Sequence, residues 1–163
     1  MVVYKKGDLF DHIDSEEIVI VHSCNAQGVW GSGFALQLSK IFPCALKSYE
    51  KCCLNYKKCK VDITGKALLV KDFFKKNLIV CLITSEYYGK YKSEQEIILE
   101  KTKLALEDFL TKLPLKNEIV IHSPKINSGL FGVSWDLTEP IINDFLDKCK
   151  QNNKNITWIV WEK

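Results

Sequence analysis

The chain alternates short runs of apolar residues with longer stretches in which apolar and polar residues mix. Continuous apolar runs of this kind are typical of strands that are buried on both faces of a sheet. The run LIVCLIT at 78–84 is the clearest, because it carries no charge. The pattern predicts six strands, at residues 2–5, 18–21, 66–71, 78–84, 118–122 and 156–161.

Between these runs, apolar residues recur every three or four positions, as they do along one face of a helix. The pattern is clearest over 93–113, where Ser93 followed by Glu96 predicts a capping box at the helix start. Pro43 should end one helix or open the next. The other predicted helices cover 34–42, 45–56 and 135–149, the last with Ser134, Asp136 or Thr138 as its N-cap.

Strands that alternate with helices favour an α/β sandwich with a mixed, mostly parallel sheet. The chain has 163 residues, which is an ordinary size for one domain. It contains no internal repeat, low-complexity tract or linker. We therefore expect residues 1–163 to form a single domain.

Composition narrows the range of partners and the cellular compartment. The formal net charge of +3 is too small to indicate a nucleic-acid groove, although it suits a phosphorylated small ligand. The seven cysteines form no disulfide framework, and no apolar run is long enough for a membrane span or a signal peptide. We expect a soluble, monomeric, cytoplasmic protein with reduced thiols, with the nucleus as a second location in a eukaryotic cell.

Two glycine-rich loops, 23–33 and 123–135, each follow an apolar strand and precede a helix. Ligands of open α/β sheets lie beyond the carboxyl ends of the strands, where such loops begin. Glycine allows close backbone approach and converging N–H groups, and a helix N-terminus adds partial positive charge. Two such loops could hold a diphosphate. Neither matches a P-loop or a G-x-G-x-x-G turn, and tight turns alone remain an alternative explanation.

The nucleophilic and metal-binding side chains indicate the chemistry of the protein less clearly than the two glycine-rich loops do. His22 ends an apolar strand and could act as a general base or hold the loop by hydrogen bonds. Cys24 lacks the C-x5-R pattern of a cysteine phosphatase, and the chain contains no arginine. The doublet Cys52-Cys53 and Cys59 lack a second C-x-x-C pair or a nearby histidine, so no metal site is expected.

Three segments resemble the signature segments of macro domains: GDLF at 7–10, VHSCNAQGVWGSGFALQL at 21–38 and PKINSGLFGVSW at 124–135. They are most similar to the small stand-alone branch that has ADP-ribose 1″-phosphate phosphatase activity. The resemblance spans nearly the whole chain. It implies a three-layer α/β/α fold with a mixed, mostly parallel sheet, and ADP-ribose or ADP-ribose 1″-phosphate as the ligand.

The resemblance also implies roles for individual residues. Asp8 would accept a hydrogen bond from the adenine amino group, Trp161 would lie against adenine, and Asn25 would contact the distal ribose. Asp8 could instead only shape a turn, and Trp161 could be a half-buried strand residue. The implied ligand-binding residues are Gly7, Asp8, Leu9, Ser23, Cys24, Asn25, Trp30, Gly31, Ser32, Gly33, Phe34, Ala35, Asn127, Ser128, Gly129, Leu130, Phe131, Gly132, Val133 and Trp161.

Macro domains include both hydrolases and non-catalytic readers, so the fold alone does not decide the reaction. Phe131 and Ser85 stand where the branch that removes ADP-ribose from glutamate carries its aspartate and lysine. The resemblance thus implies a phosphatase that needs no metal or cofactor, with Asn25 and His22 as catalytic residues and backbone amides that receive the phosphate. The alternatives are a non-catalytic ADP-ribose reader, or an ADP-ribosyl hydrolase that acts on modified protein or nucleic acid.

Overall fold

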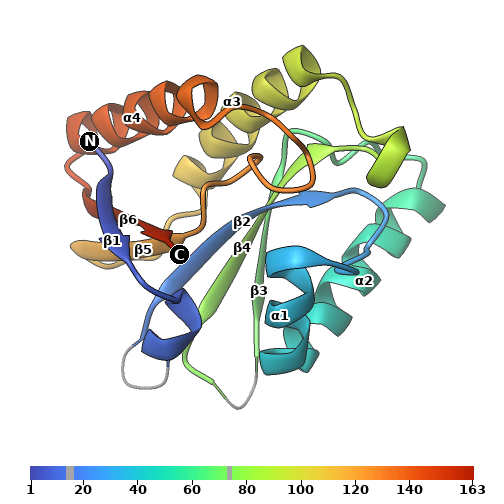
Figure 1. Ribbon diagram of the computed structural model, residues 1–163, viewed down its shortest axis with the longest axis horizontal. Coiled ribbons are helices and arrows are strands. Elements are labelled where there is room, and N and C mark those ends of the chain that lie inside the picture. Colours follow the sequence, from blue (N-terminus) through green and yellow to red (C-terminus); the bar gives the residue numbers. More distant parts are fainter. Residues whose placement is uncertain (14–16, 73–74) are drawn as a thin grey trace.

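The computed structural model describes residues 1–13, 17–72 and 75–163. Figure 1 shows a central sheet between two layers of helices. All six predicted strands are present, each within a few residues of its expected position except β2, which runs on past its predicted end. The strands are β1 Val3–Lys6, β2 Val19–Asn25, β3 Ala67–Lys71, β4 Leu78–Ser85, β5 Glu118–Ser123 and β6 Asn155–Glu162.

The four predicted helices are also found, and two short 3-10 helices were not predicted. Pro43 occupies the first turn of its helix, where the missing N–H of proline leaves no bond unmade. Among the described helices, none combines the length and apolar character that crossing a bilayer would require. The helices are α1 Gly33–Ile41, α2 Pro43–Lys58, α3 Gln95–Thr111 and α4 Trp135–Gln151, with the 3-10 helices η1 Leu9–His12 and η2 Gly89–Tyr91.

The strand order is β1-β6-β5-β2-β4-β3. Every neighbouring pair is parallel except β3 and β4. The sheet is therefore mixed and mostly parallel, as predicted. The carboxyl ends of β1, β6, β5, β2 and β4 share one edge of the sheet, so the segments that follow these strands all emerge at that edge.

The two faces of the sheet carry separate apolar cores (Figure 1). Helices α3 and α4 cover one face, where Phe109 and Phe145 pack with Trp158 of β6. Helices α1 and α2 cover the other face, where Phe42 and Tyr49 are fully buried. This arrangement confirms the three-layer α/β/α prediction.

Two local predictions were wrong. The loop expected from residue 23 begins only after Asn25, because β2 keeps pairing with β4 across a bulge as far as Asn25 and Ser85. The capping box at Ser93 does not form either. Glu94 occupies the N-cap position of α3, and the Ser93 hydroxyl lies beside Ser85 instead. Both errors concern polar residues that pair with Ser85 at the end of β4.

Candidate functional site

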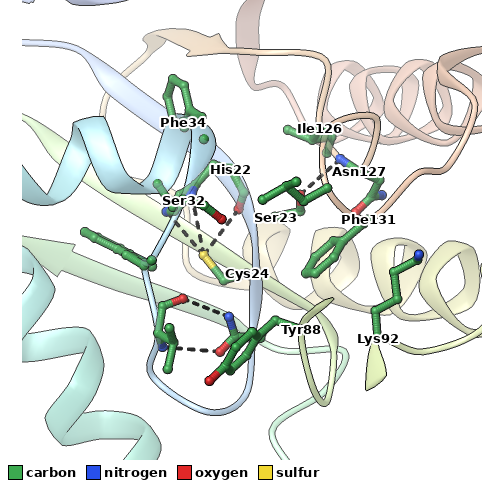
Figure 2. A pocket seen from close by; sticks show the side chains of 18 of the residues that line it. His22, Ser23, Cys24, Ser32, Phe34, Tyr88, Lys92, Ile126, Asn127 and Phe131 are labelled. Carbon is green, nitrogen blue, oxygen red and sulfur yellow. Dashed lines mark hydrogen bonds between the residues drawn. The ribbon is translucent and has the colours of Figure 1, made fainter. Parts of the chain in front are cut away.

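A cavity of about 830 Å³ opens at the shared carboxyl edge of the parallel strands (Figure 2). Four segments meet around it: the end of β2, the loop into α1, the connection from β4 to α3, and the loop after β5. The lining residues are 22–25, 29–35, 88–90, Lys92, 124–127 and 129–131. The two glycine-rich loops thus face one cavity, as the sequence predicted.

Asn25 shapes the first loop with its side-chain amide. Its Oδ1 accepts the N–H groups of Gln27 at 3.0 Å and Val29 at 3.3 Å, and its Nδ2 donates to the Val29 carbonyl at 2.8 Å. The Tyr49 hydroxyl donates to the Asn25 main-chain oxygen. Because Oδ1 is fully used, Asn25 can offer a ligand only its second Nδ2 hydrogen.

The N-terminus of α1 faces the cavity without a side-chain cap. Ser32 occupies the N-cap position in extended conformation, and its hydroxyl makes no capping bond. Leu36 donates to the Ser32 carbonyl, but among the described residues the N–H groups of 33–35 have no acceptor. Unpaired N–H groups at a helix N-terminus attract anions.

Asn127 fixes the second loop. Its backbone adopts the left-handed conformation with φ +64°, and its N–H donates to Ser23 Oγ at 3.0 Å. Its buried side chain accepts from Thr84 Oγ1 at 3.0 Å and donates to Thr102 Oγ1 at 2.8 Å. These bonds tie the loop to β2, β4 and α3 at once.

Only part of the second loop can offer amides to a ligand. The N–H groups of Asn127, Ser128, Gly132 and Val133 already donate to acceptors within the protein. Within the described chain, the N–H groups of 129–131 have no acceptor. The expected amide cradle is therefore narrower than the full segment 127–133.

Three lysines join the amides at this cavity: Lys90, Lys92 and Lys125. Lys125 forms an ion pair with Glu162 at 2.6 Å. Lys92 Nζ lies 4.0 Å from where a Cβ on Gly132 would stand, and Figure 2 places this side chain beside Phe131. Sequence reasoning missed Lys90 and Lys92 because they lie on the β4–α3 connection, outside both glycine loops, and it did not weigh Lys125.

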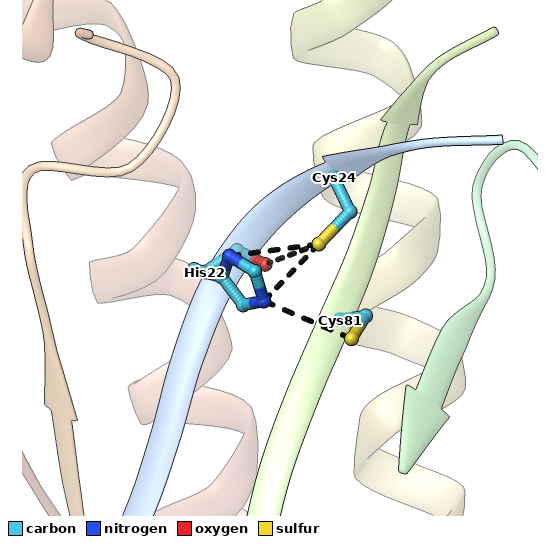
Figure 3. A group of neighbouring side chains, drawn as sticks. All are labelled: His22, Cys24 and Cys81. Carbon is cyan, nitrogen blue, oxygen red and sulfur yellow. Dashed lines mark hydrogen bonds between the residues drawn. The ribbon is translucent and has the colours of Figure 1, made fainter. Parts of the chain in front are cut away.

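His22 is buried at the cavity wall beside two thiols (Figure 3). Its Nε2 lies 3.2 Å from Cys24 Sγ and 3.8 Å from Cys81 Sγ, and its ring meets the Trp30 ring edge-on at 5.0 Å. Burial opposes the Cys24 thiolate, but the hydrogen bond from Cys81 and the interaction with the adjacent His22 outweigh it, so the pKa of Cys24 falls to about 6. Burial, followed by the nearby Cys24, raises the pKa of Cys81.

The residues assigned to adenine lie next to the cavity. Asp8 Oδ1 accepts the Phe10 N–H at 3.0 Å, and Oδ2 pairs with Lys163 at 3.3 Å. Trp161 donates to His122 Nδ1 at 2.9 Å, and its ring stacks on His12 at 4.5 Å between centroids. Phe10 stacks on Phe34 at 5.0 Å, which links this group to the cavity wall.

The sequence-predicted residues therefore fall into two groups. His22, Ser23, Cys24, Asn25, Trp30, Gly31, Ser32, Gly33, Phe34, Ala35, Asn127, Gly129, Leu130 and Phe131 line the cavity. Outside its lining are Gly7, Asp8, Leu9, Ser128, Gly132, Val133 and Trp161.

Comparisons with known proteins agree with this geometry. The Macro domain profile matches residues 21–142. The ADP-ribose 1″-phosphate phosphatase of Debaryomyces hansenii is 34% identical to the chain, and the match covers 89% of this chain and 94% of that protein. The ADP-ribose 1″-phosphate phosphatase of Saccharomyces cerevisiae is 33% identical, and the match covers 88% of this chain and 92% of that protein. The macrodomain of Mycobacterium tuberculosis DarG superposes with a TM-score of 0.75 at 21% identity, covering 100% of this chain and 98% of that one. The chain belongs to the macro domain family.

Proposed function

We propose that this chain hydrolyses ADP-ribose 1″-phosphate to ADP-ribose and inorganic phosphate. The relatives that bear this name share about a third of their residues with it over most of both lengths. The structural observation that carries the proposal is the convergence of two sets of unpaired amides, at 33–35 and 129–131, on one cavity. Such a cavity suits a ligand with several phosphate groups.

The amides and Lys92 would stabilise the transferring phosphoryl group. In phosphoryl transfer, negative charge spreads over the phosphate oxygens, so fixed donors around them lower the barrier. The amides at 33–35 act at the positive end of α1. Lys92 adds a full positive charge near Gly132. This revises the expectation that backbone amides alone receive the phosphate.

Asn25 and His22 are the proposed catalytic residues. Asn25 holds the distal ribose through its one free Nδ2 hydrogen, donating to a ribose oxygen. His22 lines the same cavity and activates the attacking water as a general base. Its contacts with Trp30 and Phe34 support a second role, in which the ring holds the cavity wall.

The adenine end would lie over the carboxyl ends of β1 and β6. Asp8 accepts from the adenine amino group, with the Leu9 amide beside it. The His12 ring now stacks on Trp161, so adenine reaches the Trp161 face once His12 turns aside. The contact between Phe10 and Phe34, which lines the cavity, supports a position for this end directly beside the cavity.

The deciding experiment offers the purified protein ADP-ribose 1″-phosphate and an ADP-ribosylated protein side by side, each with and without excess EDTA. We expect phosphate release from the first substrate only, at the same rate with EDTA. Release of ADP-ribose from the second substrate alone would instead assign an ADP-ribosyl hydrolase. Tight binding of ADP-ribose without turnover of either substrate would assign a reader.

A further inference from the structure

His22, Cys24 and Cys81 bring together three soft ligand atoms from two adjacent strands (Figure 3). His22 and Cys24 lie two residues apart on β2 and therefore point to the same face of the sheet. Cys81 on β4 is the register partner of His22, so it joins them on that face. The ligand atoms all lie within 4.8 Å of one another.

The spacing of these atoms fits a single metal ion. In a tetrahedral zinc site, the usual bond lengths place a nitrogen and a sulfur about 3.5 Å apart and two sulfurs about 3.8 Å apart. His22 Nε2 lies 3.2 Å from Cys24 Sγ and 3.8 Å from Cys81 Sγ. Cys24 Sγ also lies 3.6 Å from His22 Nδ1 and so stands over the ring, which means that the imidazole must turn to point Nε2 at an ion held by both sulfurs.

The donor set selects the kind of ion. Two thiolates and an imidazole suit Zn²⁺ and other thiophilic cations, whereas Mg²⁺ and Ca²⁺ require oxygen ligands. A disulfide between Cys24 and Cys81 fits less well. The two residues are diagonal neighbours on parallel strands, which places their Cα atoms about 8 Å apart, beyond the reach of a disulfide.

The cluster is accessible from the cavity. His22 and Cys24 line the cavity, while Cys81 is fully buried behind them. Trp30, whose ring contacts His22 edge-on, carries a buried Nε1–H that makes no well-formed hydrogen bond among the described residues and that lies close enough to Cys24 to help lower the pKa of its thiol. An unpaired buried donor favours negative charge nearby, such as a metal-bound thiolate or anion.

We propose that His22 Nε2, Cys24 Sγ and Cys81 Sγ bind one Zn²⁺ ion, with the fourth coordination position open to the cavity. Binding replaces the thiol protons, which pass to solvent, with two Zn–S bonds. The ion also occupies His22 Nε2, so that His22 can no longer accept a proton from water. The proposal has a second part, which rests on the proposed function. Bound Zn²⁺ reversibly inhibits the metal-independent release of phosphate.

Cobalt titration tests the site without reference to activity. We expect one equivalent of Co²⁺ to give a thiolate-to-cobalt charge-transfer band and the visible d–d bands of a tetrahedral ion, and Zn²⁺ to bleach both. Cys81→Ala should lower Zn²⁺ affinity, measured by competition with a chromophoric chelator, by more than the roughly 10–100-fold typical of losing an outer-sphere partner. Cys149→Ala is the matched control, because Cys149 is equally buried but lies in the opposite core.

Absence of the charge-transfer band in the wild-type protein would overturn the site, as would equal bands in Cys81→Ala and Cys149→Ala. If Cys81→Ala does not fold, Cys24→Ala removes a ligand at the cavity wall and must also abolish the band. For the second part, Zn²⁺ should inhibit phosphate release by the wild type, EDTA should restore it, and Cys81→Ala should resist inhibition. If Zn²⁺ binds and turnover is undiminished, only the proposed inhibition is overturned. If the protein gives the cobalt spectrum but has no phosphatase activity, the proposed metal site is supported and the proposed function is not.

Discussion

Asn127 is the residue on which the second loop depends, and its substitution should be costly. Alanine would be strained at φ +64° and would leave the buried Thr84 hydroxyl without its acceptor. We expect Asn127→Ala to lower the free energy of unfolding by about 2–4 kcal/mol, measured by urea denaturation. Asn153→Ala is the control, because Asn153 has φ +58° but is exposed, and it should cost only about 1 kcal/mol. Equal losses would mean that the buried hydrogen bonds contribute little.

Asn25 should affect the reaction more than the binding of the product. Asn25→Ala removes the acceptor for the Gln27 and Val29 amides, so some stability is lost, on the order of 1–2 kcal/mol. The positioning of the distal ribose counts most in the transition state. We expect turnover of ADP-ribose 1″-phosphate to fall by at least about 10²-fold while ADP-ribose affinity, measured by calorimetry, falls far less. Parallel losses in both quantities would assign Asn25 to loop structure alone.

At the scale of elements, periodicity was enough to predict the strands and helices, because each buries a regular apolar face. The strand β2 was predicted too short, since its final residues HSCN are polar and read as a loop. Their pairing with β4, as far as Ser85, is a tertiary contact that no local pattern reports. The thiol pair Cys24 and Cys81 was missed for the same reason, because Cys81 lies within an apolar strand.

The connection between β4 and α3 supplies the next prediction. Lys92→Met removes a positive charge near the second loop while keeping an apolar side chain of similar length. Because a hydrogen bond to a charged group contributes about 1.5–3 kcal/mol, we expect the KM for ADP-ribose 1″-phosphate to rise by about tenfold or more. Phosphate release measured over a range of substrate concentrations gives this value. Lys90→Met is the control, since the Lys90 ammonium lies over the Tyr91 ring at 5.1 Å. A larger rise in KM for Lys90→Met than for Lys92→Met would assign phosphate binding to Lys90 instead.

At the scale of the whole molecule, the parallel sheet decides where the site lies. Five carboxyl ends share one edge, so segments from residue 7 to residue 161 meet there although they are distant in the sequence. The sequence could place both glycine loops at this edge from strand and helix order alone. It could not predict that His12 covers Trp161, because that contact depends on side-chain packing between η1 and β6.

The sheet order also predicts that the two ends of the ligand are recognised independently. Strands β6, β5 and β2 separate β1 from β4, which places the strands that precede Asp8 and Lys92 about 19 Å apart. Asp8→Ala should weaken binding of AMP and of ADP-ribose by about tenfold or more, because a hydrogen bond to a carboxylate is lost. Lys92→Met should instead weaken inhibition by inorganic phosphate and leave AMP binding unchanged. Since the sites share no partner, the free-energy losses for ADP-ribose should add in the double variant to within about 0.5 kcal/mol. If Asp8→Ala weakens phosphate inhibition as much as AMP binding, the ligand does not span the edge of the sheet in this way.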